Sequence, residues 1–190
     1  MVDQFIDRTF KREKSFFGKG CVAHVSVADP ICNRLSTLAG EAAKQAGATI
    51  HKGGTYLAME GPQFSTKAES HMYRAWGCDV IGMTNMPEAK LAREAELPYA
   101  TMAMVTDYDC WHEGHGSVDV ASVIAILQQN SATGAKAVLE LTKKLGSMER
   151  TSCPSGIDTN LDVAIITPSE ARDPKLMAKL DAVAGRVLKS

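Results

Sequence analysis

The chain has 190 residues, of which 45% are hydrophobic and 23% charged, so it is long enough to bury the core of an ordinary globular domain. Lys and Arg number 21 against 22 Asp and Glu, and no basic stripe predicts a nucleic-acid or membrane-surface partner. The N-terminus carries an acid at position 3 and no long apolar run, so we expect neither a signal peptide nor a membrane span, and a cytoplasmic location.

Strand and helix patterns alternate along the chain, which favours an α/β fold. The expected strands cover residues 21–27, 49–59, 79–83 and 99–106, and residues 161–166 form a short apolar run. The expected helices cover residues 33–47, 67–76, 87–96 and 117–145, with a last helix that opens at Asp173 and Pro174.

Five cysteines are scattered along the chain without a C-x-x-C motif or a histidine pair at zinc spacing. We therefore expect reduced thiols in the core and no metal site.

The run at residues 98–111 is the most informative, because an uncharged, strand-like segment ends in two carboxylates. Asp107 and Asp109 would project from the same face of a strand, with Tyr108 opposite. Repulsion and partial desolvation would favour a neutral, proton-donating form of one acid. The alternative is that one acid caps the following turn while the other is solvated, and two acids alone do not separate these possibilities.

Two joints between a strand and a helix could also contact a ligand, since sites in open α/β sheets gather at strand ends. In the first, Phe64 could stack on a flat ring and Ser65 could point its hydroxyl into a cleft, although Ser65 could simply start the helix. In the second, Thr84 and nearby backbone N–H groups suit an anion such as phosphate. Met83 could pack against an apolar ligand face or fill the core.

Together, residues 60–65, 82–88 and 106–111 resemble the 5′-methylthioadenosine phosphorylases of the trimeric purine nucleoside phosphorylase family. Residues 3–9 are also similar to that family. The resemblance implies a phosphorylase-like α/β fold with a mixed central sheet flanked by helices, and a homotrimer that acts in purine and methionine salvage.

The implied reaction is phosphorolysis, in which inorganic phosphate attacks the anomeric carbon of the nucleoside while the bond to adenine breaks. No cofactor is implied, and phosphate is the co-substrate. By similarity, Asp107 protonates or hydrogen-bonds N7 of the purine, while Asp109 and Ser65 read the 6-amino edge. The remaining implied contacts are Thr84 to phosphate, Met83 to the ribose, and Phe64 and Tyr108 to the nucleoside.

The 5′ substituent of the nucleoside is implied by the same resemblance. Relatives that act on 6-oxopurine nucleosides carry Glu at the position of Ser65, Asn at that of Asp107 and His at that of Val120. Val120, Val123 and Ile124 share one helical face and could form an apolar slot for a thiomethyl group, or pack in the core. A 6-oxopurine nucleoside phosphorylase is the weaker alternative.

The chain begins inside what resembles an internal strand of the family. We therefore expect residues 1–190 to form a single α/β domain that corresponds to the C-terminal portion of a nucleoside phosphorylase, with an incomplete phosphate site. This leaves two hypotheses open: an active phosphorylase, or a fragment that binds the nucleoside but does not position phosphate.

Overall fold

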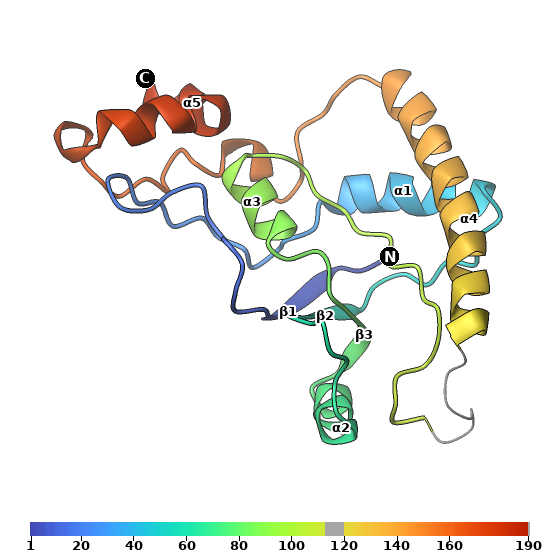
Figure 1. The fold of residues 1–190 in the computed structure, drawn as a ribbon. Helices are drawn as coiled ribbons and strands as arrows, with labels where there is room; N and C mark the ends of the chain where they lie inside the picture. The colour runs from blue at the N-terminus through green and yellow to red at the C-terminus, as the bar shows by residue number, and fades with distance from the viewer. Residues whose placement is uncertain (113–119, 190) are drawn as a thin grey trace.

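The computed structural model describes residues 1–112 and 120–189, with residues 120–123 described as backbone only. At its centre is a sheet of three strands in the order β1 (Gln4–Arg8), β2 (Thr55–Met59) and β3 (Cys78–Gly82) (Figure 1). Both pairs of strands are parallel, so the carboxyl ends of all three meet at one edge of the sheet.

The described part of the chain contains five α-helices. Figure 1 shows α4 beside α1 at one end of the molecule and α5 at the other end. The helices are α1 (Asn33–Gln45), α2 (Lys67–Ala75), α3 (Glu88–Glu94), α4 (Val120–Gly146) and α5 (Pro174–Leu188), with short 3-10 turns η1 (Ile157–Thr159) and η2 (Ser169–Ala171).

The helix starts follow from local chemistry. The Thr66 side chain accepts a hydrogen bond from the Glu69 backbone N–H, and the Glu69 carboxylate accepts one from the Thr66 N–H, which forms a complete capping box before α2. Asp173 caps α5 through the Lys175 N–H, and Pro174 occupies the first turn. Both starts were predicted from the sequence.

Two predicted strands are wrong. In the described part of the chain, residues 21–27 and 99–106 form no strand, and their pairing is limited to isolated antiparallel bridges, such as the one that joins Val2 to Thr101. The run at residues 161–166 likewise makes a single bridge, from Ile165 to Ala23. The α/β class is confirmed, while in place of a mixed sheet the described residues form a parallel sheet with separate antiparallel bridges.

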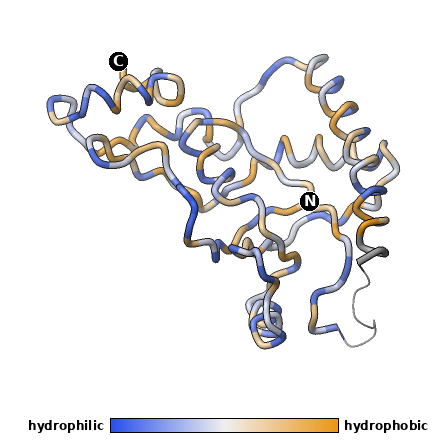
Figure 2. The backbone as a smooth tube through the Cα atoms, viewed as in Figure 1, coloured by the Kyte–Doolittle hydropathy of each residue, from blue (hydrophilic) through white to orange (hydrophobic). Residues whose placement is uncertain are grey.

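The core lies on both sides of β2, whose residues Tyr56, Leu57 and Ala58 are all buried. A second cluster joins α5 to the residues around Cys21. Cys21, Cys32 and Cys153 are buried free thiols, as predicted, whereas Cys110 is exposed and does not belong to the core. Apolar residues also follow α4 (Figure 2), where several remain exposed to solvent. No described helix combines the length and the apolar character that crossing a membrane requires.

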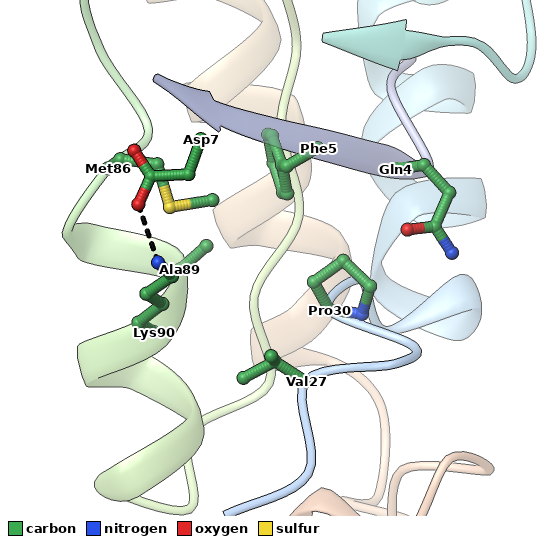
Figure 3. A pocket seen from close by; sticks show the side chains of 8 residues that line it. All are labelled: Gln4, Phe5, Asp7, Val27, Pro30, Met86, Ala89 and Lys90. Carbon is green, nitrogen blue, oxygen red and sulfur yellow. Dashed lines mark hydrogen bonds and ion pairs between the residues drawn. The ribbon is translucent and has the colours of Figure 1, made fainter. Parts of the chain in front are cut away.

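Asp7, at the carboxyl end of β1, links this strand to α3. Its Oδ2 atom lies 2.8 Å from Lys14 Nζ and 2.5 Å from Lys90 Nζ, and Figure 3 shows the Lys90 pair beside a cavity of about 220 Å³. Its Oδ1 atom accepts hydrogen bonds from the Thr9 N–H and hydroxyl. Burial alone would raise the pKa of Asp7, but the two lysines and Thr9 outweigh it and hold that pKa well below its usual range.

Truncating the central strand should be costly. Leu57 is fully buried, so Leu57→Ala removes core contacts and leaves a cavity, and we expect it to lower the free energy of unfolding by about 2–5 kcal/mol in urea titrations. The matched control is Leu97→Ala, because Leu97 is 59% exposed and should change stability by less than about 0.5 kcal/mol. Equal losses in the two variants would contradict the central position of β2.

The contacts of Asp7 with Lys14, Lys90 and Thr9 predict that part of the free energy of unfolding is lost at low pH. Because the pKa of Asp7 is lowered in the folded state, its ionised form stabilises the fold fully above the unfolded pKa of about 4, and this contribution is lost as the pH falls below that value. Asp7→Asn should therefore be less stable than the unaltered chain at pH 7, and the difference should shrink towards pH 3. Urea unfolding at both pH values measures it, with Asp29→Asn as an exposed control. A difference that stays constant with pH would exclude this role.

Candidate active site

Loops that follow β2 and β3 meet at the carboxyl edge of the sheet. Gly61, just after β2, has a φ of 72°, and a Cβ atom placed on it would lie 2.5 Å from the sulfur of Met83, just after β3. Only glycine allows both the left-handed backbone and this close approach. The two predicted joints are therefore packed against each other, through the contact of Gly61 in the first joint with Met83 in the second.

Thr84 is exposed at this edge and is anchored by a buried tyrosine. The Tyr56 hydroxyl lies 3.1 Å from Thr84 Oγ1, and the Thr84 backbone N–H donates to the same hydroxyl over 3.4 Å. Tyr56 is 5% exposed, so the anchor comes from the interior of the sheet.

The next residue, Asn85, fixes the same turn from another direction. It is buried with a φ of 70°, a left-handed conformation that Asn tolerates better than most residues. Its Oδ1 atom accepts hydrogen bonds from the Tyr99 hydroxyl at 3.0 Å and the Thr101 hydroxyl at 2.9 Å. Residues 99–101, which precede the two acids in the chain, are thus hydrogen-bonded to the turn that carries Thr84.

Arg12, in the loop after β1, joins the other two loops. Its guanidinium donates to the backbone oxygens of Met59 and Glu60 and to that of Met86, and its Nε lies 3.6 Å from the Glu60 carboxylate. The Glu60 carboxylate also accepts the N–H groups of Phe10 and Lys11, and these contacts hold the pKa of Glu60 below its usual range. All three loops at the edge are therefore connected.

Ser65 and Phe64 lie in the loop between β2 and α2. The Ser65 hydroxyl oxygen is buried and has no hydrogen-bond partner among the described residues. An unpaired buried hydroxyl is unfavourable, so this atom is suited to a bond with a ligand. The Ser65 backbone oxygen accepts from the Cys110 thiol at 3.8 Å, while the Phe64 ring is 86% exposed.

The two predicted acids lie in different surroundings. Asp109 is half-buried, and its carboxylate accepts from the Ser70 hydroxyl of α2 at 2.5 Å and from the Cys110 N–H at 2.8 Å. Asp107 is exposed and accepts from the neighbouring Thr106 hydroxyl. Of the two alternatives that the sequence left open, the strand end with two desolvated acids is wrong, because the segment before them does not pair as a strand. The structure fits the other alternative, since Asp107 is exposed and Asp109 accepts from the following turn.

Aromatic side chains follow the acids. The Tyr108 ring is 58% exposed and stacks on His112, with ring centroids 4.4 Å apart. The Arg74 guanidinium of α2 lies 3.9 Å from the centre of the Trp111 ring, which is close enough for a cation–π contact. Residues 108–112 are therefore tied to α2 by Trp111 as well as by Asp109.

The predicted apolar slot is described only in part. The side chains of Val120 and Val123 lie outside the described residues, and Ile124 is 48% exposed. The helix α4 and the segment before the acids are linked through Asn130, whose side-chain amide donates to the Val105 oxygen at 3.1 Å.

The structure therefore anchors several of the candidate residues through contacts that the sequence did not reveal. Ser65 lies against Cys110, Met83 against Gly61, and Asp109 against Ser70. The supporting side chains that sequence reasoning missed are Arg12, Tyr56, Ser70 and Asn85. Of these, Asn85 carried a usable signal, since an Asn directly after a strand suits a left-handed turn. No group of three His, Cys, Asp or Glu side chains in the described ranges could hold a metal ion.

Residues 1–143 match the family model described as the phosphorylase superfamily. The chain is 64% identical over 189 residues to an S-methyl-5′-thioadenosine phosphorylase of Cereibacter sphaeroides and 59% identical to one of Bradyrhizobium diazoefficiens. In both comparisons the match covers 100% of this chain and 65% of the relative, so the chain spans slightly less than two thirds of the length of these curated relatives.

Solved structures agree with these relatives. A methylthioadenosine phosphorylase from an antarctic soil metagenomic library superposes with a TM-score of 0.83 at 44% identity, covering 96% of this chain and 63% of that one. A methylthioadenosine phosphorylase of Schistosoma mansoni in complex with adenine gives 0.73 at 31% identity, covering 84% and 62%. On the sequence match, the overall identity and the shared fold, the chain belongs to the phosphorylase superfamily.

Proposed function

We propose that this protein acts in the phosphorolysis of 5′-methylthioadenosine, which yields adenine and 5-methylthioribose 1-phosphate. The names of the two bacterial relatives support this substrate. The observation that carries the proposal at the site is the buried Ser65 hydroxyl, which lacks a partner among the described residues and lies beside the segment of the two acids. The proposal includes a homotrimer that works in purine and methionine salvage in the cytoplasm, as in the family that the motifs resemble.

At the phosphate end, Thr84 is the proposed contact. The residue is exposed, its hydroxyl lies 3.1 Å from the Tyr56 phenol, and its backbone is fixed by Tyr56 on one side and by the Asn85 contacts on the other. A preorganised donor costs little reorganisation when an anion binds. Phosphate then attacks the anomeric carbon as the bond to the base breaks, and no cofactor takes part.

At the base end, Asp107 is the proposed catalytic residue. Negative charge accumulates on the purine as the glycosidic bond breaks, and a proton donated or shared at N7 neutralises it. Asp109 and Ser65 are proposed to bind the 6-amino edge. Asp109 already accepts two hydrogen bonds, and a carboxylate has lone pairs for further donors such as an amino group.

Apolar and aromatic side chains complete the proposed nucleoside site. Met83 packs under the ribose, and Phe64 and Tyr108 offer exposed rings to the nucleoside. The thiomethyl group is assigned to Val120, Val123 and Ile124. An apolar slot would leave a 5′-hydroxyl without its hydrogen bonds, at a cost on the order of 1–3 kcal/mol, and therefore favours the thioether.

The direct test is adenine release by the purified chain from 5′-methylthioadenosine. We expect release only when inorganic phosphate is present, measured by chromatography of the free base. Binding of the nucleoside without release would contradict phosphorolysis by this chain and favour a nucleoside-binding function instead. Release without phosphate would indicate hydrolysis.

The role of Asp107 can be tested separately by base binding. Asp107→Asn exchanges the acid for the amide that 6-oxopurine relatives carry here, and an amide N–H can donate to the 6-oxo group that neighbours N7. We therefore expect the preference for adenine over hypoxanthine to fall by about tenfold in calorimetric titrations. The matched control is Asp181→Asn, which changes an exposed acid on α5 and should leave the preference unaltered. An unchanged preference in Asp107→Asn would exclude Asp107 as the residue that contacts the base.

A further inference from the structure

We propose that Tyr56 is a positioning residue, which orients the Thr84 hydroxyl so that its proton points towards inorganic phosphate. The inference rests on the proposed function, because it assumes that Thr84 contacts the anion. It concerns a buried side chain of the central strand that sequence reasoning had placed in no site.

The order of hydrogen bonds around Thr84 supports this role. A backbone N–H can only donate, so the Tyr56 oxygen is the acceptor of the 3.4 Å bond from Thr84. The phenolic proton is then available to the Thr84 Oγ1 atom at 3.1 Å. When Oγ1 accepts this proton, the Thr84 hydroxyl is left with its own proton to donate elsewhere.

Phosphate requires this polarity at the hydroxyl. Its ionised oxygens accept hydrogen bonds, so Thr84 must donate to bind it. A freely rotating hydroxyl could instead donate to Tyr56 and present its lone pairs to the anion, which would be repulsive. Because the Tyr56 phenol also accepts from the Thr84 N–H, donation back to Oγ1 gives each group one partner.

The surroundings hold the phenol in place. A Cβ atom on Gly82, at the end of β3, would lie 2.0 Å from the Tyr56 hydroxyl oxygen and 2.9 Å from the adjoining ring carbon. Glycine at this position therefore provides the space through which the phenol reaches Thr84. On β1, the Phe5 ring meets the Tyr56 ring edge-on with centroids 6.0 Å apart. The ring is thus fixed by both neighbouring strands.

The test is the affinity for inorganic phosphate, measured by calorimetry on the whole chain with Tyr56→Phe. This variant keeps the ring and removes only the hydroxyl, so we expect the affinity to fall by about tenfold while the affinity for adenine stays unchanged. In a chain that already carries Thr84→Val, Tyr56→Phe should cause no further loss of phosphate affinity. The matched control is Tyr73→Phe, since Tyr73 is 6% exposed in α2, and it should leave phosphate affinity unchanged.

Three results would overturn the positioning role of Tyr56 or the proposed function behind it. Unchanged phosphate affinity in Tyr56→Phe, or an equal loss for phosphate and adenine, would overturn the positioning role while leaving the proposed function in place. If Tyr56→Phe lowered phosphate affinity as much in the Thr84→Val chain as in the unaltered chain, Tyr56 would act through another group. This result would also overturn the positioning role. Failure of the unaltered chain to bind phosphate would overturn the phosphate half of the proposed function and this inference together.

Thermal unfolding of each variant checks that it is folded. Because Thr84→Ser retains a hydroxyl, Tyr56→Phe should lower phosphate affinity in that variant as it does in the unaltered chain.

Discussion

The turn that follows β3 is held by side chains from three other parts of the chain, and the arrangement of the candidate site depends on it. Tyr56 reaches Thr84 from the central strand, Tyr99 and Thr101 bind Asn85, and Arg12 binds Met86. Asn85 also adopts a left-handed backbone, which by itself is unfavourable for a residue other than glycine. These bonds together hold the turn that carries Thr84.

This constraint divides the candidate site into two regions of different character. The proposed phosphate region lies in the turn after β3 and is connected through Arg12 to the ends of β1 and β2. The base region lies in segments outside the sheet, where Phe64, Asp107 and Tyr108 are exposed and Ser65 has an unpaired buried hydroxyl. A fixed proposed anion site beside a more exposed proposed base site would suit a reaction in which phosphate must be aligned with one carbon atom while the departing base needs hydrogen bonds to its edge.

Features set by neighbouring residues could be predicted from the sequence, whereas features set by distant partners could not. The capping box of Thr66 and Glu69 and the start of α5 at Asp173 depend on residues within one helical turn, and both are confirmed. The segment at residues 99–106 has the composition of a strand, but a strand also needs a neighbouring strand, and among the described residues only Thr101 of this segment forms a β-bridge, with Val2. Ser70 and Tyr56 give no local sign of a role, because their partners Asp109 and Thr84 lie 39 and 28 residues away in the chain.

The most direct test of the account is a crystal structure of the chain with adenine and inorganic phosphate. We expect the phosphate within hydrogen-bond distance of the Thr84 hydroxyl and the base beside Ser65 and Asp107. Adenine bound elsewhere, for example in the cavity between β1 and α3, with Ser65 and Asp107 remote from it, would contradict the central claim that the carboxyl edge of the sheet is the nucleoside site.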